Sequence, residues 1–203
     1  MIKNLLFDLA GVLFNLDIET DTKALHAVGL PDFDVCLKRP EIFRPVLAYL
    51  NGLLPEDEFL TQIRPCCNAD ATDEAILYSM NAVLGDLPVS RMAMLVELRK
   101  RYHVYLLSNL NERDWLHTQR VVAQAGYSID QLFDQAFVSY QLHLAKPDPR
   151  IYEHVIAQTG LLPEETIYLD DMRENVESGL RMGFVAHLVP MNHLEDVLPT
   201  ILM

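Results

Sequence analysis

The stretch Asn4-Leu5-Leu6-Phe7-Asp8-Leu9-Ala10-Gly11-Val12-Leu13 decides how the rest of the sequence is interpreted. A short apolar run ends in a carboxylate and a glycine follows, which is typical of a buried strand that stops at a turn. Burial of an acid costs free energy unless a partner compensates it. We therefore expect Asp8 at the carboxyl end of a strand, facing a cation in the crevice where open α/β sheets bind their ligands.

The same arrangement occurs twice more along the chain. Residues 104–107 are apolar and precede Ser108-Asn109, and residues 167–169 are apolar and precede Asp170-Asp171. Helical patterns separate these strands, and such alternation indicates a parallel, doubly wound sheet. Right-handed crossovers on both sides of the first strand make that strand central. The sequence thus predicts an α/β fold whose sheet edge carries one hydroxyl and three carboxylates.

The remaining pattern divides the chain into two parts. Further strands are expected at 136–138 and 184–189, and helices at 20–28, 41–50, 73–84, 89–101, 115–125, 147–159 and 173–182, with a helix start near 55. No strand is expected between residues 18 and 87, so this helical block is predicted to be a lid inserted after the first strand. We expect a core domain of residues 1–16 and 88–203 and a helical cap domain of residues 17–87.

Charge limits the classes of partner that the protein can bind. Its 203 residues include 16 lysines and arginines against 29 aspartates and glutamates, a formal net charge of −13. A protein that grips nucleic acid or an anionic membrane needs a basic face, so neither partner is expected. A small phosphorylated metabolite remains compatible with this charge when a bound divalent cation reverses the local sign.

The amino terminus and the cysteines indicate a cytoplasmic protein. Met1-Ile2-Lys3 runs directly into the first strand, so we expect no signal peptide, and no apolar run is long enough to span a bilayer. Cys36, Cys66 and Cys67 are odd in number and lack a zinc-binding spacing. Reduced thiols are the expected state.

Four segments resemble the four motifs of the haloacid dehalogenase superfamily of phosphohydrolases. They are Asp8 to Leu13, Leu107-Ser108-Asn109, Lys146-Pro147-Asp148-Pro149, and Leu169-Asp170-Asp171 with Asn175. The resemblance covers essentially the whole chain and implies a Rossmann-like sheet of strand order 3-2-1-4-5 with a helical cap of the C1 type. Small bacterial sugar-phosphate phosphatases and the phosphatase domain of soluble epoxide hydrolase are the most similar members.

The resemblance also implies roles for the polar residues at the strand ends. Asp8 would be the nucleophile that attacks phosphorus and forms an aspartyl phosphate. Ser108 and Asn109 would bind the phosphoryl group, and Lys146 would neutralise charge on the nucleophile and on the phosphoryl oxygens. The catalytic set is therefore Asp8, Ser108 and Lys146, and the substrate-binding set is Ser108, Asn109 and Lys146.

The metal site implied by the resemblance is built from oxygen ligands. Mg²⁺ would be held by Asp8, the backbone carbonyl of Ala10, Asp170 and Asp171. An oxygen-rich shell of this kind suits Mg²⁺. The implied activity is a Mg²⁺-dependent phosphatase acting on small phosphomonoesters, with sugar phosphates as candidates.

Ala10 departs from the family pattern. That position usually holds a second aspartate, which protonates the leaving group and then activates water, a contribution of roughly 10²–10⁴-fold. Alanine keeps the backbone carbonyl but lacks the acid. The sequence therefore predicts impaired acid–base catalysis, with three possible outcomes: slow turnover, preference for leaving groups that need little protonation, or loss of turnover.

Other polar and aromatic residues have simpler explanations. Asp17 is predicted to cap the helix that begins at residue 18. His26 is assigned to a cap helix and His103 to the start of a strand, without catalytic roles. Tyr49 and Phe43 are expected to pack in the cap, since aromatics at helical spacing are usually core residues.

Two alternatives to the phosphatase remain open at this point. A catalytically silent phosphate- or metal-binding relative is supported by Ala10. A metal-free haloacid dehalogenase is also conceivable, but the Asp170-Asp171 pair is an unneeded feature in such an enzyme. The sequence leaves the substrate and the oligomeric state open.

Overall fold

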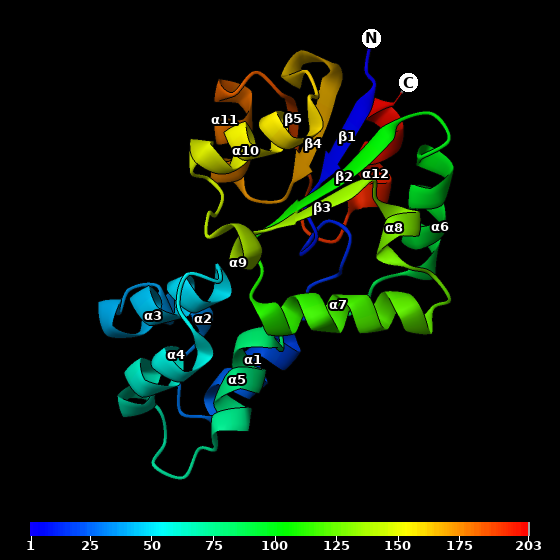
Figure 1. Ribbon diagram of the computed structural model, residues 1–203. Helices are drawn as coiled ribbons and strands as arrows, with labels where there is room; N and C mark the ends of the chain where they lie inside the picture. The colour runs from blue at the N-terminus through cyan, green and yellow to red at the C-terminus, as the bar shows by residue number, and fades with distance from the viewer. Residues whose placement is uncertain (203) are drawn as a thin grey trace.

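A parallel five-stranded sheet forms the centre of the protein (Figure 1). The computed structural model describes residues 1–202, and its strands run in the order β3-β2-β1-β4-β5. The strands are β1 (Asn4–Phe7), β2 (His103–Ser108), β3 (Gln135–Val138), β4 (Thr166–Asp170) and β5 (Val185–Leu188). This confirms the predicted α/β class, the parallel sheet and the central position of the first strand.

The residues of β1 are buried on both faces of the sheet. Leu5 and Phe7 belong to one hydrophobic cluster and Leu6 to another on the opposite face, and all three are 0% exposed. Phe7 pairs with Leu106 of β2 and Leu169 of β4. The parallel register therefore brings the residues that follow these three strands to one edge.

Helices cover both faces of this sheet. Figure 1 shows α10 and α11 on one side and α6, α8 and α12 on the other, which makes the sheet doubly wound. The helices of this part are α6 (Val89–Leu98), α7 (Glu112–Gln124), α8 (Ile129–Leu132), α9 (Ser139–Leu142), α10 (Pro149–Thr159), α11 (Arg173–Arg181) and α12 (Leu194–Ile201), with the short 3₁₀ helix η2 (Pro163–Glu165).

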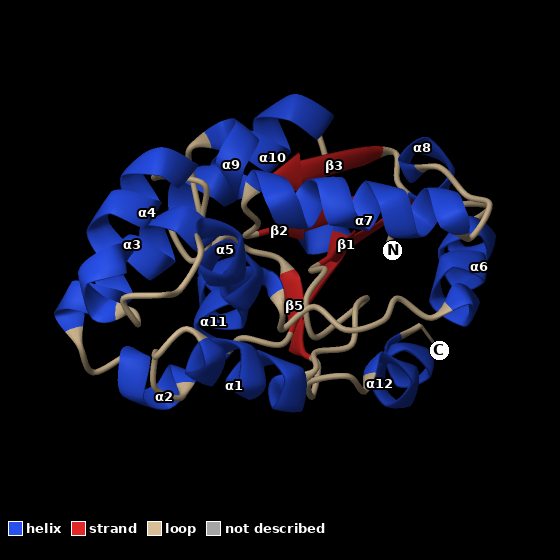
Figure 2. Cartoon of the chain, turned by 90° about the horizontal axis from the view of Figure 1, so that it is seen from below, coloured by secondary structure: helices blue, strands red, loops and turns tan. Residues whose placement is uncertain are grey.

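A separate helical block lies beyond the end of the sheet. It consists of α1 (Ile18–Ala27), α2 (Phe33–Cys36), α3 (Pro40–Leu50), α4 (Glu56–Ile63), the 3₁₀ helix η1 (Arg64–Cys66) and α5 (Asp73–Asn81). The block has its own hydrophobic cluster, in which Tyr49 stacks on Phe59 with ring centroids 4.3 Å apart. Figure 2 shows these helices grouped to one side of the strands. The expected packing role of Tyr49 is thus what the structure shows.

The chain enters and leaves this helical block through adjacent segments. Leu16 and Leu84 form an isolated antiparallel bridge. The backbone N–H of Asp17 donates to the carbonyl of Val83 at 2.8 Å, and that of Gly85 donates to Asn15 at 2.9 Å. The predicted domain boundaries at 16/17 and 87/88 fall close to this junction, and the division into two domains stays a prediction.

Several elements differ from the sequence-based expectation in their ends. Helix α7 begins at Glu112 rather than at 115, because the side chain of Asn111 caps it by accepting the N–H of Asp114. Helices α2, α8, α9 and α12 go beyond the expected elements, and the first three have only four residues each. Helices this short carry too few apolar repeats for a periodic signal.

No helix within residues 1–202 is long and apolar enough to cross a lipid bilayer. The three cysteines are free thiols, with Cys36 buried and Cys66 and Cys67 half-buried. The cytoplasmic location stays a prediction.

Candidate active site

Polar side chains from three neighbouring strands meet at one edge of the sheet. Asp8 directly follows β1, Ser108 is the last residue of β2, and Asp170 is the last residue of β4. The Ser108 hydroxyl donates a hydrogen bond to Oδ1 of Asp8 at 2.7 Å. The predicted convergence of these residues is what the fold produces, since the strands are parallel and in register.

Lys146 reaches this edge from the segment between α9 and α10. Its Nζ atom lies 2.9 Å from Oδ1 of Asp8 and 2.6 Å from Oδ2 of Asp170, and it also donates to the carbonyl of Leu107 at 2.9 Å. Burial lowers the pKa of Lys146, but the two carboxylates outweigh that effect and raise the pKa above its ordinary value. Lys146 therefore carries a fixed positive charge beside Asp8.

Asp170 is fully buried and fully hydrogen-bonded. Its Oδ2 accepts from Lys146 and from the Tyr168 hydroxyl at 2.5 Å, and its Oδ1 accepts from the Met172 N–H at 2.8 Å and the Asn175 amide at 3.0 Å. A carboxylate offers about four lone-pair sites, so these donors occupy them all. Asp170 consequently holds Lys146 in place, and its role as a direct metal ligand stays a prediction.

Asp8 and Asp171 have the oxygens that remain available. Within residues 1–202 the Oδ2 atom of Asp8 has no hydrogen-bond partner, and neither carboxylate oxygen of Asp171 has one. Burial raises the pKa of Asp8, and Asp170 adds to the effect while Lys146 opposes it. Burial, followed by repulsion from Asp8 and Asp170, raises the pKa of Asp171 to about 7. Lys146 therefore compensates only part of the negative charge of Asp8 and Asp171.

Gly11 allows Asp171 to approach the loop that follows β1. Its φ of +79° is in the left-handed region, and a Cβ atom at this position would lie 2.2 Å from Oδ2 of Asp171. Any side chain at position 11 would therefore clash with the Asp171 carboxylate in its present position. Gly11 is therefore needed for two reasons: it adopts the left-handed conformation of the turn, and it leaves room for the Asp171 carboxylate.

The donor set fits a hard divalent cation. Asp8, Asp170 and Asp171 each offer an oxygen within 4.8 Å of the others. The carbonyl of Ala10 accepts no hydrogen bond from residues 1–202. The cluster combines these three carboxylates with the ammonium of Lys146, which pairs with Asp8 and Asp170, so it keeps an excess of negative charge that a divalent cation would balance. Oxygen ligands of this kind are preferred by Mg²⁺.

Asn109 supports Lys146 rather than pointing away from it. Its side-chain amide donates to the carbonyl of Lys146 at 2.9 Å, and its Oδ1 accepts the N–H of Lys146 at 2.9 Å. Both polar atoms of this side chain are therefore engaged. Contact between Asn109 and a substrate would have to come from its backbone.

Arg91 and Asn192 hold the loop after β1 and are not predicted from the sequence. Arg91 is only 3% exposed, donates to the carbonyls of Val12 and Leu13 at 3.0 and 2.9 Å, and pairs with Glu195 at 2.6 Å. The Asn192 N–H donates to the carbonyl of Gly11 at 2.8 Å. The sequence signal for Arg91 is a charge on the same helical face as Leu95, which is buried.

The residues assigned no catalytic role lie outside the cluster. Asp17 accepts from the Thr20 N–H at 2.9 Å and caps α1, as predicted. His26 contacts Asp32 at 2.6 Å on the surface, and His103 is an exposed residue at the start of β2. Within residues 1–202, the acids that gather with Asp8 as possible metal ligands are Asp170 and Asp171. In the described part of the chain, no further acid joins this group to replace the carboxylate that position 10 lacks.

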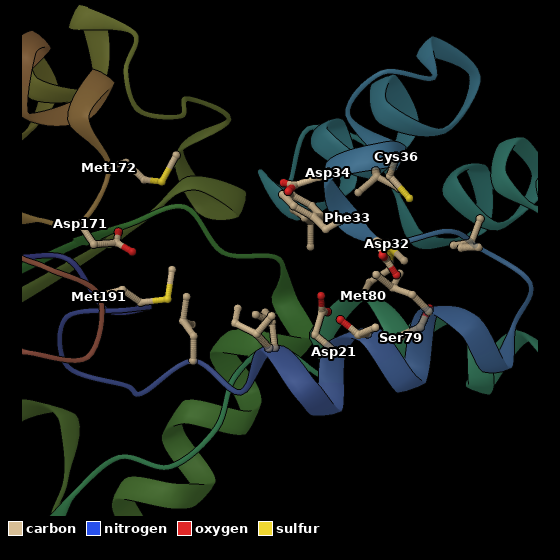
Figure 3. A pocket seen from close by; sticks show the side chains of 18 residues that line it. Asp21, Asp32, Phe33, Asp34, Cys36, Ser79, Met80, Asp171, Met172 and Met191 are labelled. Carbon is tan, nitrogen blue, oxygen red and sulfur yellow. The ribbon is translucent and has the colours of Figure 1, made fainter.

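A cavity of about 530 Å³ adjoins Asp171 and extends into the helical block. Figure 3 shows Asp171, Met172 and Met191 on one side of it and Asp21, Ser79 and Met80 on the other. This volume is in the range of small-molecule sites, roughly 300–1,000 Å³.

Comparison with known proteins places these features in a wider context. A family model described as haloacid dehalogenase-like hydrolase matches residues 2–183. The chain is 31% identical to a D-ribitol-5-phosphate phosphatase of Bacteroides thetaiotaomicron over 91% of this chain and 90% of that protein. It is 30% identical to a sesquiterpene phosphatase of Aspergillus oryzae over 98% of this chain and 92% of the relative.

The fold is also similar to that of a solved structure. A HAD family enzyme of Bacteroides thetaiotaomicron, crystallised with magnesium and inorganic phosphate, superposes with a TM-score of 0.83 at 30% identity, covering 95% of this chain and 96% of the other.

Proposed function

The chain belongs to the haloacid dehalogenase-like hydrolases, and from that membership we propose that it is a Mg²⁺-dependent phosphatase of small phosphomonoesters. The observation that carries the proposal is the Oδ2 atom of Asp8, which lies near the charge of Lys146 and the carboxylate of Asp171 and accepts no hydrogen bond from the described residues 1–202. Two relatives named as phosphatases and a structural relative that binds magnesium and phosphate support the same reaction class.

Asp8 is proposed as the nucleophile. Its Oδ2 forms a bond to phosphorus while the bond from phosphorus to the ester oxygen breaks, which gives an aspartyl phosphate and the alkoxide or alcohol. Water then cleaves the acyl phosphate and releases inorganic phosphate. The hydrogen bond from Ser108 and the ion pair with Lys146 both engage Oδ1 of Asp8, which leaves Oδ2 as the atom available to attack the substrate.

Ser108 and Lys146 are proposed to stabilise the transferring phosphoryl group. Ser108 would turn its hydroxyl toward a phosphoryl oxygen, and the Lys146 ammonium lies close enough to Asp8 to offset charge on both groups. Phosphoryl transfer depends mainly on placement and electrostatic stabilisation, which these buried groups provide.

Asp8, Asp171 and the Ala10 carbonyl are the groups proposed to hold Mg²⁺. Asp170 would act through Lys146 or through a water molecule, since hydrogen bonds already occupy its oxygens. When bound, Mg²⁺ supplies charge neutralisation for the phosphate and for the acidic cluster.

Ala10 is proposed to limit acid–base catalysis. With no carboxylate at this position, leaving groups that depart without protonation would be favoured. A silent binding protein is the second candidate function, and the missing acid is the observation that favours it.

The helical block of residues 17–87 is proposed to be a cap domain over the core of residues 1–16 and 88–203. Arg113 of α7 pairs with Glu56 of α4 at 2.6 Å and with Glu74 of α5 at 3.2 Å. These contacts link the block to the sheet-bearing part. Lids of this type close over a reaction and exclude water from it.

Hydrolysis of p-nitrophenyl phosphate with and without Mg²⁺ tests the proposal. The leaving group of this ester needs little protonation, so Ala10 does not mask activity. We expect metal-dependent turnover that is lost in Asp8→Asn. Binding of phosphate without turnover would support the silent alternative, and turnover that persists in Asp8→Asn would overturn the assignment of the nucleophile.

A further inference from the structure

The cavity beside Asp171 has walls that are mostly apolar. Leu25 of α1, Val46 of α3 and Met80 of α5 line it within the helical block, and Met172 and Met191 line it on the side of the sheet (Figure 3). Residues 1–202 place no lysine, arginine or histidine in this lining. The cavity therefore has nothing to offer a second phosphate or a carboxylate on the substrate.

Of the carboxylates in this lining, Asp32 and Asp34 are exposed and Asp171 is half-buried, whereas Asp21 is buried. Asp21 of α1 is 9% exposed, and its side chain accepts no hydrogen bond from residues 1–202. Figure 3 shows it across the cavity from Asp171, beside Ser79 of α5. The Ser79 hydroxyl donates to the carbonyl of Ile76 at 2.8 Å, so it does not donate to Asp21. Buried carboxylates normally accept hydrogen bonds, so Asp21 has acceptor atoms that a ligand could use.

We propose that this cavity binds a phosphomonoester whose alcohol is mainly apolar and ends in a hydroxyl group, with Asp21 accepting the hydrogen bond of that hydroxyl. The inference rests on the proposed phosphatase function and names its substrate class. The hydroxyl is at the end remote from phosphorus, because Asp171 and Asp21 line opposite ends of the cavity. Burial raises the pKa of Asp21 to about 6, so the carboxylate is still mostly ionised at neutral pH.

A polyol phosphate fits the lining of this cavity less well than a phosphomonoester of a mainly apolar alcohol. Each of its hydroxyl groups would need a polar partner. The cavity offers few inside: Asp32 and Asp34 are exposed residues, and the Ser79 hydroxyl already donates to Ile76, so some of the hydroxyl groups would face apolar walls unpaired. The relatives include one phosphatase named for a polyol phosphate and one named for a sesquiterpene, so their names do not decide between the classes. The composition of the walls favours the apolar class.

Binding of alkylphosphonates in the presence of Mg²⁺, measured by calorimetry, tests the proposal without requiring turnover. Ethyl-, butyl- and hexylphosphonate should bind with rising affinity, at most about fourfold per methylene buried. Among hexylphosphonates, the 6-hydroxy compound should bind more tightly than the unsubstituted one, and the 6-carboxy compound should bind most weakly.

Variants identify the contribution of Asp21. In Asp21→Leu, the preference for the 6-hydroxy over the unsubstituted compound should fall by about 10- to 100-fold, the range for a hydrogen bond to a charged group. Asp21→Asn keeps an acceptor and should retain part of the preference. Asp70→Leu changes an exposed acid outside the cavity and should retain all of it.

Three results would overturn the proposal: no phosphonate binding, affinity that does not depend on chain length, or an unchanged hydroxyl preference in Asp21→Leu. Failure of the proposed function is a separate result, namely no Mg²⁺-dependent release of phosphate from p-nitrophenyl phosphate. In that case the phosphonate series still tests which ligands the cavity binds, because it measures binding alone.

Discussion

Lys146 and Asp170 form a salt bridge of 2.6 Å in which the two side chains are only 1% and 0% exposed. A buried pair of this kind contributes little net stability, but removal of one partner leaves an uncompensated charge. Lys146 is thus both a structural requirement of the acidic cluster and a group placed to act on the substrate.

We expect Lys146→Met to destabilise the protein by about 3–5 kcal/mol, because Asp8 and Asp170 would lose their common cation. Activity should fall on the order of 10²–10³-fold through lost transition-state stabilisation. Urea denaturation with and without Mg²⁺ measures the first effect, and Mg²⁺ should recover part of the stability. In a double-mutant cycle, Lys146→Met combined with Asp170→Asn should cost less than the sum of the single changes. Additive costs would show that the two side chains do not interact.

Ala10→Asp should restore a proton donor to the site. We expect the rate on alkyl phosphates, whose leaving groups need protonation, to rise by about 10²–10⁴-fold, with little change on p-nitrophenyl phosphate. Steady-state kcat/KM for both ester types gives the comparison, and Ala10→Asn controls for size. Equal gains on both esters would mean that missing acid catalysis is not what limits the enzyme.

Gly52→Ala should disturb the contact between the helical block and helix α9. Gly52 has a φ of +69°, and its missing Cβ atom would lie 2.1 Å from the Cα atom of Tyr140 in α9. Gly160 has a φ of +67° with no atom within 4 Å of that position, so Gly160→Ala is a matched control for backbone strain alone. Both variants should lose about 1–2 kcal/mol from the left-handed conformation.

Only Gly52→Ala should also change the contact with Tyr140. We expect it to raise KM and to increase amide hydrogen exchange at residues 139–142, because the loop after α3 can no longer rest on α9. The same changes in Gly160→Ala would contradict this explanation.

Asp114 should make stability fall as pH rises. Burial raises its pKa to about 7 from an ordinary value of 3.8, and its Oδ1 atom has no hydrogen-bond partner among residues 1–202. Between these two pH values the folded state keeps a proton that the unfolded state has lost, so the free energy of unfolding decreases with rising pH. The full difference is on the order of 4 kcal/mol.

Chemical denaturation of wild type and Asp114→Asn from pH 4 to pH 8 measures this contribution. The stability of the wild type relative to that of the variant should decline across the interval and level off above pH 7. Asp70→Asn alters an exposed acid, and the difference in stability between this variant and wild type should not change with pH. If the stabilities of wild type and Asp114→Asn change with pH in the same way, Asp114 is not the group that keeps the proton.

The sequence predicted the sheet and the positions of the strand-end acids because both depend on local patterns. A buried strand that ends in an acid is visible in a few residues, as at Phe7-Asp8 and Leu169-Asp170, and parallel pairing then brings such ends together. Contacts between distant segments leave no such local trace. Arg91 pairs with Glu195, more than a hundred positions away, and the engagement of Asn109 with the backbone of Lys146 depends on how two loops meet.

The cavity could not be predicted from the sequence either. Asp21 lies in an ordinary amphipathic helix, and nothing in its neighbours distinguishes it from a solvated acid. Only the packing of α1 against α5 shows that it is buried beside Ser79.

The bridge between Leu16 and Leu84 has a consequence for how such proteins diversify. Because the two crossings lie side by side, the intervening segment can be exchanged as a cassette whose ends need to match only one short β-pair. A replacement with different cavity walls would leave Asp8, Ser108, Lys146 and Asp171 where they are. Substrate choice and bond-breaking chemistry can then be inherited, or engineered, independently of each other.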